Sequence, residues 1–130
     1  YYYNSRKVGR QLTDEEYYAE LEKLAGDLPI RAVIVDPSAA SFIEVIRRHG
    51  RFYVEKASNS VLDGVRDVAT RLQSGDIFIC SCCTDCIREF GLYRWDEKAP
   101  MDRPIKENDH AMDEVRYFVH KIFAPEIFSF

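Results

Sequence analysis

Residues 30–38 read IRAVIVDPS, and this stretch decides the class of fold. Its first six residues form a short, mostly apolar, β-branched run, which is typical of a strand buried on both faces in a parallel α/β layer. The run ends at Asp36-Pro37-Ser38, and a helix is expected to follow through about Arg48, closed by Gly50. A buried strand followed by a helix favours an α/β fold.

The segments on either side continue this alternation. Upstream, Thr13 and Glu16 form a capping box that begins a helix, and Gly26 marks its end. The remaining expected strands are a strand end at residues 1–3, a short strand within 51–56 and a strand at 76–80. The remaining expected helices cover residues 61–74, 84–93 and 110–123, and the longer connections are a basic loop at 4–11 and a polar linker at 95–108. We therefore expect residues 1–130 to form a single α/β domain.

The composition sets limits on the class of protein. A chain of 130 residues can bury the core of one domain. Its longest apolar runs fall far short of the ~20 residues that a membrane span needs, and its start has no apolar signal-peptide region. Because the sequence begins without Met, we expect it to be a piece of a longer protein.

The net charge of −4 argues against a dedicated DNA-binding module, which would normally be basic. An acidic balance is compatible with an enzyme that holds divalent metals and touches DNA only locally. Two basic clusters, Arg47-Arg48-His49 with Arg51 and Arg6-Lys7 with Arg10, are candidates for phosphate contacts or for ordinary solvated surface.

Asp36 is the first candidate for chemistry. It follows the buried run directly, and open α/β sheets usually bind ligands at the carboxyl ends of their strands. The structural alternative is that Asp36 or Ser38 only caps the helix that follows.

His110 and Asp113 are the second candidates, at the start of the last expected helix, which Asp109 can cap. They are three positions apart, so they face the same way, away from the apolar stripe of that helix. Such a pair can bind a divalent metal or orient a water molecule. Asp113 has a structural alternative as well, because an acid in a first turn complements the helix dipole.

Asp36 and Asp113 together suggest more than either does alone. Two-metal phosphodiester hydrolysis uses hard oxygen ligands that hold Mg²⁺ or Mn²⁺ ions about 3.5–4 Å apart. Such a site normally needs three or four carboxylates, and the sequence places two of them.

Three stretches around these residues resemble a known family. They read VDPSAASF at residues 35–42, NSVLDGVR at 59–66 and KENDHAMDEVRY at 106–117. They are similar to the C-terminal nuclease domain of phage terminase large subunits, in the group found in PBSX-like and SPP1-like phages. The resemblance runs in order from about Tyr1 to Phe123, and the last stretch is its most specific part.

The resemblance implies a ribonuclease-H-like fold, with a mixed central sheet flanked by helices, here without its first strands. It implies a metal-dependent endonuclease that cuts concatemeric double-stranded phage DNA during packaging, using two Mg²⁺ or Mn²⁺ ions in the complete domain. Asp36 matches the family's second metal-binding aspartate, Asp113 its last, and His110 an accessory active-site histidine. The first catalytic aspartate of the family lies upstream of Tyr1, so we expect impaired activity in this piece.

The implied partners are double-stranded DNA and, in the parent protein, an ATPase motor domain, the terminase small subunit and the portal, with no membrane. The implied location is the cytoplasm of a bacterial host, in a protein of phage or prophage origin. The sequence itself contains no G-x-x-x-x-G-K-[ST] motif for nucleotide phosphates.

Two other functions remain open from the sequence. One is another ribonuclease-H-like nuclease of the resolvase or transposase type. The other is a catalytically inactive remnant or a cysteine-dependent interaction module, since four cysteines lie within seven residues, at positions 80, 82, 83 and 86. These cysteines can be read as a Zn²⁺ site, as a redox-active pair at Cys83 and Cys86, or as ordinary buried or half-exposed thiols.

Overall fold

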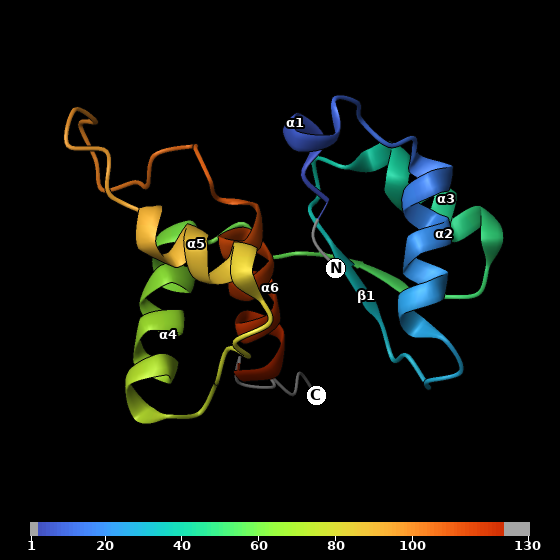
Figure 1. Ribbon diagram of the computed structural model, residues 1–130. Coiled ribbons are helices and arrows are strands. Elements are labelled where there is room, and N and C mark those ends of the chain that lie inside the picture. Colours follow the sequence, from blue (N-terminus) through green and yellow to red (C-terminus); the bar gives the residue numbers. More distant parts are fainter. Residues whose placement is uncertain (1–2, 124–130) are drawn as a thin grey trace. The chain divides into compact units, whose positions relative to one another are not determined.

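The computed structural model describes residues 3–123. The chain divides between Ala57 and Ser58 into two compact units, named here the N-terminal unit and the C-terminal unit (Figure 1). Each unit has its own helices and its own buried side chains. The single domain expected from the sequence stays a prediction.

The N-terminal unit contains a strand–helix–strand element. Strands β1 (Val33–Val35) and β2 (Val54–Lys56) are parallel, with Val33 opposite Val54. Helix α3 (Ala40–His49) connects them, because parallel neighbours need a long crossover rather than a tight turn. Gly50 ends the helix in a left-handed conformation, as expected from the sequence. Both expected strands are therefore present, although β1 is shorter than the apolar run at residues 30–35 and β2 begins only at Val54.

Two further helices complete this unit, α1 (Ser5–Val8) and α2 (Asp14–Ala25). Helix α2 packs on α3 through Tyr18, whose ring stacks on His49 with centroids 3.8 Å apart. The core of the unit is built from side chains of α2, α3, the two strands and the segment between α3 and β2. Its members are Tyr18, Ala25, Val35, Ile43, Val45, Ile46, Phe52 and Val54.

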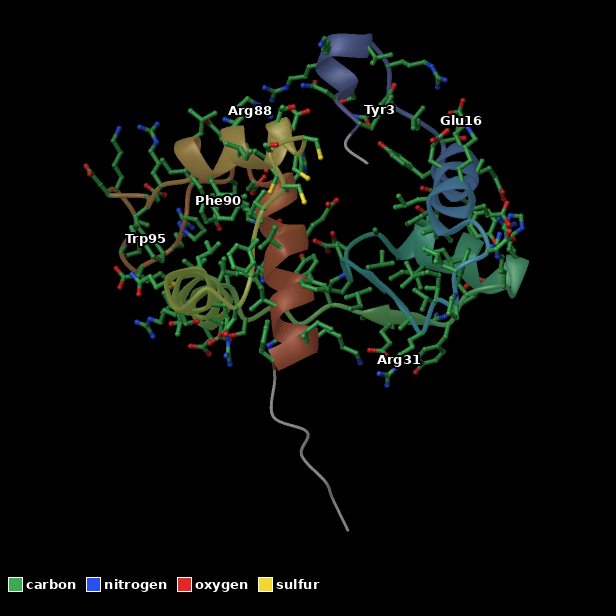
Figure 2. All side chains as sticks on the ribbon, turned by 60° about the horizontal axis from the view of Figure 1, so that its bottom comes forward. Tyr3, Glu16, Arg31, Arg88, Phe90 and Trp95 are labelled. Carbon is green, nitrogen blue, oxygen red and sulfur yellow. The ribbon has the colours of Figure 1, made fainter. Side chains whose placement is uncertain are left out.

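The C-terminal unit is helical where it is regular. Its helices are α4 (Val61–Ser74), α5 (Thr84–Leu92) and α6 (His110–Phe123), and α6 packs against both of the others. Phe90 extends from α5 toward α4 (Figure 2). Together with residues of α4 and α6 it lines an apolar cavity of about 210 Å³.

The prediction of a strand at residues 76–80 is wrong. In the structure, residues 77–80 have no regular secondary structure, and Phe78 is 85% exposed. Isoleucine and phenylalanine suit a strand, but a strand forms only when a neighbouring strand takes up its backbone hydrogen bonds. No strand in residues 3–123 pairs with this segment.

Two other expectations need correction. The loop expected at residues 4–11 contains helix α1, which Asn4 caps by accepting a hydrogen bond from Lys7 N. Tyr3 lies outside any strand, and the rest of the strand end expected at residues 1–3 falls outside the described residues. The helices expected at 61–74, 84–93 and 110–123 are confirmed within a residue.

Two coarser points complete the comparison with the sequence. The described residues form helices and one two-stranded parallel sheet, which agrees with an α/β class. None of the helices in residues 3–123 combines the length and the apolar character needed to cross a membrane.

The start of α2 gives a pH-dependent contribution to stability. Thr13 Oγ1 accepts from Glu16 N, and Glu16 Oε2 accepts from Thr13 N, so the predicted capping box is confirmed. Glu16 projects from this turn (Figure 2) and also pairs with Arg10, at 2.8 Å. The hydrogen bond from Arg10, followed by that from Thr13, lowers the pKa of Glu16 from 4.5 to about 2.

A carboxyl group with a lowered pKa stabilises the fold above its unfolded pKa, and this contribution is lost as the pH falls through its folded pKa. We therefore expect Glu16→Gln to lower the melting temperature at neutral pH. The difference from the unsubstituted chain should shrink as the pH falls from about 5 to about 2. Thermal unfolding across that range measures it, with Glu44→Gln on the exposed side of α3 as the control. A difference that stays constant with pH would contradict the assignment.

Helices α4 and α6 approach closely at Gly64. A Cβ atom at this position would overlap Cγ and Cδ of Arg116, so the side chain of Arg116 occupies the space that a larger residue would fill. Gly91 on α5 has the opposite surroundings, because a Cβ atom there would meet nothing within 4 Å.

We expect the same substitution to have opposite effects at these two glycines. Gly64→Ala should lower the free energy of unfolding by about 1–2 kcal/mol, because the cost of overpacking exceeds the gain in helix propensity. Gly91→Ala should raise it by about 0.5 kcal/mol, because only the propensity term applies. Urea unfolding of the two variants measures both changes, and equal effects would contradict the close approach.

Candidate active site

Asp36 lies directly after β1 and is partly buried. Its Oδ1 accepts hydrogen bonds from Ser38 N at 2.8 Å and from Ser38 Oγ at 2.6 Å. The residue at the N-cap of α3 is Ala39, which makes no side-chain capping bond. The N-cap position of α3 therefore belongs to neither Asp36 nor Ser38. The hydrogen bonds between these two residues organise the turn between β1 and α3 and orient the carboxylate of Asp36.

His110 and Asp113 both lie in the first turn of α6, as the sequence predicts. His110 is exposed, whereas the side chain of Asp113 is 22% exposed. Asp113 Oδ1 accepts a hydrogen bond from Nη2 of Arg116 at 2.9 Å, one turn further along the helix. The turn therefore presents an accessible imidazole beside a carboxylate that is held by a cation.

Glu89 on α5 is a residue that the sequence analysis missed. Its side chain is fully buried, at 0% exposure. Oε2 accepts from Ala111 N at 2.6 Å and from Met112 N at 3.3 Å, so a carboxylate from another helix binds the N-terminus of α6. Asp109 lies at the N-cap position of α6, as the sequence predicts, and its carbonyl oxygen accepts from Asp113 N at 2.8 Å. The side chain of Glu89 accepts from two of the N–H groups that an N-cap side chain would otherwise bind.

The position of Glu89 is favourable for a buried acid. The N-terminus of a helix carries a partial positive charge and unsatisfied N–H groups, and both favour a carboxylate there. Arg88 adds a weaker contact, with Nη2 3.8 Å from Glu89 Oε1. Glu89 therefore fixes the turn that carries His110 and Asp113.

We expect Glu89→Ala to lower the free energy of unfolding by about 2–3 kcal/mol, because charge-assisted bonds are lost and N–H groups are left buried. Glu89→Gln, which keeps an acceptor oxygen, should lower it less. Asp85→Ala, on the same helix, removes a surface ion pair with Arg88 and an acid in the first turn of α5, and should change the free energy of unfolding by less than about 1 kcal/mol. Chemical denaturation of the three variants provides the comparison. A Glu89→Ala variant as stable as Asp85→Ala would exclude the capping role.

The structure places the three predicted site residues in two different units. His110 and Asp113 share one helical turn of the C-terminal unit, and Asp36 belongs to the N-terminal unit. Within residues 3–123, no three histidine, cysteine, aspartate or glutamate side chains are grouped so that they could hold a metal ion. The metal-ligand roles of Asp36, His110 and Asp113 stay predictions.

The cysteines have the properties of ordinary thiols. Cys80, Cys82 and Cys83 are exposed, Cys86 is partly buried, and all four are free. Desolvation raises the pKa of Cys83, and the neighbouring Cys82 and Cys80 raise it further. Desolvation also raises the pKa of Cys86. Reactive cysteine pairs have lowered pKa values, so these shifts argue against the redox interpretation.

Parts of both basic clusters bind carboxylates in the N-terminal unit. Arg48 and His49 both contact Glu15, at 3.2 and 2.8 Å. Arg10 makes two hydrogen bonds to Glu16. These contacts agree with ordinary surface ion pairs for Arg10, Arg48 and His49.

The relatives found by comparison with known proteins are large terminase subunits of phages. No family model matches the chain. The chain is 25% identical over 128 residues to the terminase large subunit of Escherichia phage T5, a match that covers 94% of this chain and 29% of that protein.

Solved structures of a large terminase from a thermophilic bacteriophage match more closely. The complex of that terminase with ADP is 47% identical, with a TM-score of 0.90, over 96% of this chain and 32% of that one. A second crystal form of the same terminase is 48% identical, with a TM-score of 0.88, over 94% and 31% of the two chains. This chain therefore spans about a third of the length of the relatives it matches. Over nearly its whole length it is homologous to part of the phage large terminase subunit.

Proposed function

We propose that this chain is the nuclease part of a phage large terminase, which cleaves concatemeric double-stranded DNA during genome packaging. The observation that carries the proposal is the first turn of α6 in a chain homologous to large terminases: exposed His110 lies beside Asp113, whose carboxylate is fixed by a buried arginine. A fixed carboxylate beside an accessible histidine is suited to metal-dependent hydrolysis.

Asp36 and Asp113 are the proposed metal ligands. Both are hard oxygen donors, which suit Mg²⁺ or Mn²⁺, and the Oδ1 of each accepts a hydrogen bond, from Ser38 in the case of Asp36 and from Arg116 in the case of Asp113. When bound, the metal would supply positive charge at the attacking and leaving oxygens of the phosphodiester. His110, exposed beside Asp113, would orient the attacking water by hydrogen bonding.

The proposed substrate is recognised with little regard to sequence. Reading base edges requires an element that enters a groove with several polar side chains, and we propose no such element here. We assign ATP hydrolysis to the remaining two-thirds of the relatives' length, because this sequence has no phosphate-binding P-loop motif. The proposed partners in a full-length protein are an ATPase motor, the terminase small subunit and the portal.

Nicking of supercoiled plasmid DNA in the presence of Mn²⁺ tests the proposal. We expect the chain to nick the plasmid slowly, and we expect Asp113→Ala to reduce the rate at least about a hundredfold, because the lost carboxylate is a metal ligand. Addition of a chelator in excess over Mn²⁺ should abolish the cleavage.

Asp14→Ala is the control for the loss of an acid at a helix start. Asp14 is also a partly buried acid in the first turn of a helix, so its removal causes a similar loss of helix-dipole stabilisation without touching the proposed site. The Asp14→Ala variant should nick at the unsubstituted rate. Asp113→Ala also leaves the buried Arg116 without its ion-pair partner, so circular dichroism must establish that this variant is folded. Equal rates for Asp113→Ala and the unsubstituted chain would exclude Asp113 from the chemistry.

A further inference from the structure

We infer that Arg116 is the positioning residue of the proposed site and sets the direction of the Asp113 carboxylate. Arg116 can take up this position because Gly64 has no side chain and leaves space for it. This inference rests on the proposed function for the ligand role of Asp113. It gives a role to Arg116 on α6, to Gly64 on α4 and to Glu89 on α5, which binds the first turn of α6.

Arg116 is buried to an unusual degree for an arginine, with 4% of the residue exposed. Its Nη2 donates to Asp113 Oδ1 at 2.9 Å, and its Nη1 has only a long contact of 3.5 Å with the carbonyl oxygen of Ser58. Its Nε is buried and has no hydrogen-bond partner among the described residues. Because a buried guanidinium is costly unless it is paired, Asp113 is the partner that makes its position tenable.

Gly64 determines where the arginine side chain runs. The aliphatic carbons Cγ and Cδ of Arg116 cross α4 where a Cβ atom of residue 64 would otherwise stand. The guanidinium also lies 4.8 Å from the ring centre of Tyr117, and the side chain borders the apolar cavity of the unit. The arginine is therefore confined on several sides, and its end is directed at Asp113.

Glu89 fixes the other end of the arrangement. Its bonds to Ala111 N and Met112 N anchor the turn to which Asp113 belongs. Asp113 is thus constrained through its backbone by α5 and through its side chain by Arg116. With Oδ1 bound to the guanidinium, Oδ2 is the oxygen of Asp113 that would bind a metal ion. Partners that orient a ligand in this way usually change metal affinity by about 10–100-fold when they are removed.

Two effects of removing Arg116 oppose each other, and their signs separate a positioning role from a structural one. Loss of a positive charge beside Asp113 would strengthen the binding of a divalent cation by Coulomb attraction. Loss of the fixed orientation would weaken it. If Arg116 serves only the packing of α4 and α6, its removal should produce only the first effect, which is tighter binding of the cation.

The test is the affinity for Mn²⁺ alone, measured from the electron paramagnetic resonance signal of free Mn²⁺ during titration of the whole chain. We expect the unsubstituted chain to bind Mn²⁺ and the Asp113→Asn variant not to bind it. Arg116→Met, which keeps the aliphatic volume, should weaken binding about tenfold. Gly64→Ala, which displaces Arg116 without removing it, should also weaken Mn²⁺ binding. Gly91→Ala should leave Mn²⁺ binding unchanged. Circular dichroism of each variant establishes that it is folded.

Gly64→Ala keeps the inference testable if Arg116→Met does not fold. Tighter or unchanged Mn²⁺ binding in a folded Arg116→Met or Gly64→Ala variant, with binding still dependent on Asp113, would overturn the positioning role and leave the proposed function standing. Mn²⁺ binding that is absent from the unsubstituted chain, or that is unaffected by Asp113→Asn, would overturn the proposed function and the inference with it.

Discussion

A carboxylate enclosed in protein is stable only where donors surround it, and Glu89 is enclosed completely. The first turn of a helix has N–H groups without partners, so the acid on α5 and the start of α6 each satisfy the other. This one interaction sets where α6 begins, although residues 93–109, which contain no helix, separate α5 from α6 along the chain. The irregular linker need not specify the position of α6, because the buried carboxylate does.

The rest of the C-terminal unit follows from that placement. With its start fixed, α6 lies against α4, and a side chain at position 64 would overlap that of Arg116. The space is filled by Arg116, whose charge then needs a partner, and Asp113 provides it. A carboxylate with a required role in the fold is also a carboxylate with a defined direction, which is what a ligand in a catalytic site needs.

In the N-terminal unit an aspartate is also oriented, by a residue close to it in the sequence. Asp36 is oriented by Ser38, two residues along the chain, in the turn that links β1 to α3. The packing of α2 on α3, with Tyr18 stacked on His49, supports α3 at its far end. The two aspartates proposed as metal ligands are therefore held by different interactions within their own units. Asp36 is held by hydrogen bonds within a tight turn, and Asp113 by an ion pair with the buried Arg116 on the same helix.

The sequence by itself determined the features that depend on neighbours along the chain. Four features follow from short-range spacing and are predicted by it: the capping box at Thr13, the glycine at the end of α3, the strand–helix–strand order, and the position of His110 and Asp113 in one helix. The resemblance to large terminases was also readable from short motifs, and the homology confirms it. Only the tertiary structure decided the rest. A strand at residues 76–80 was expected from its residue types, yet a strand depends on a partner that local sequence does not specify. Glu89 looks like any acid on a helix until α6, more than 20 residues later, brings its N–H groups to it. Burial turns such acids and arginines into structural elements, and burial is a property of packing between distant segments, which the order of residues does not show.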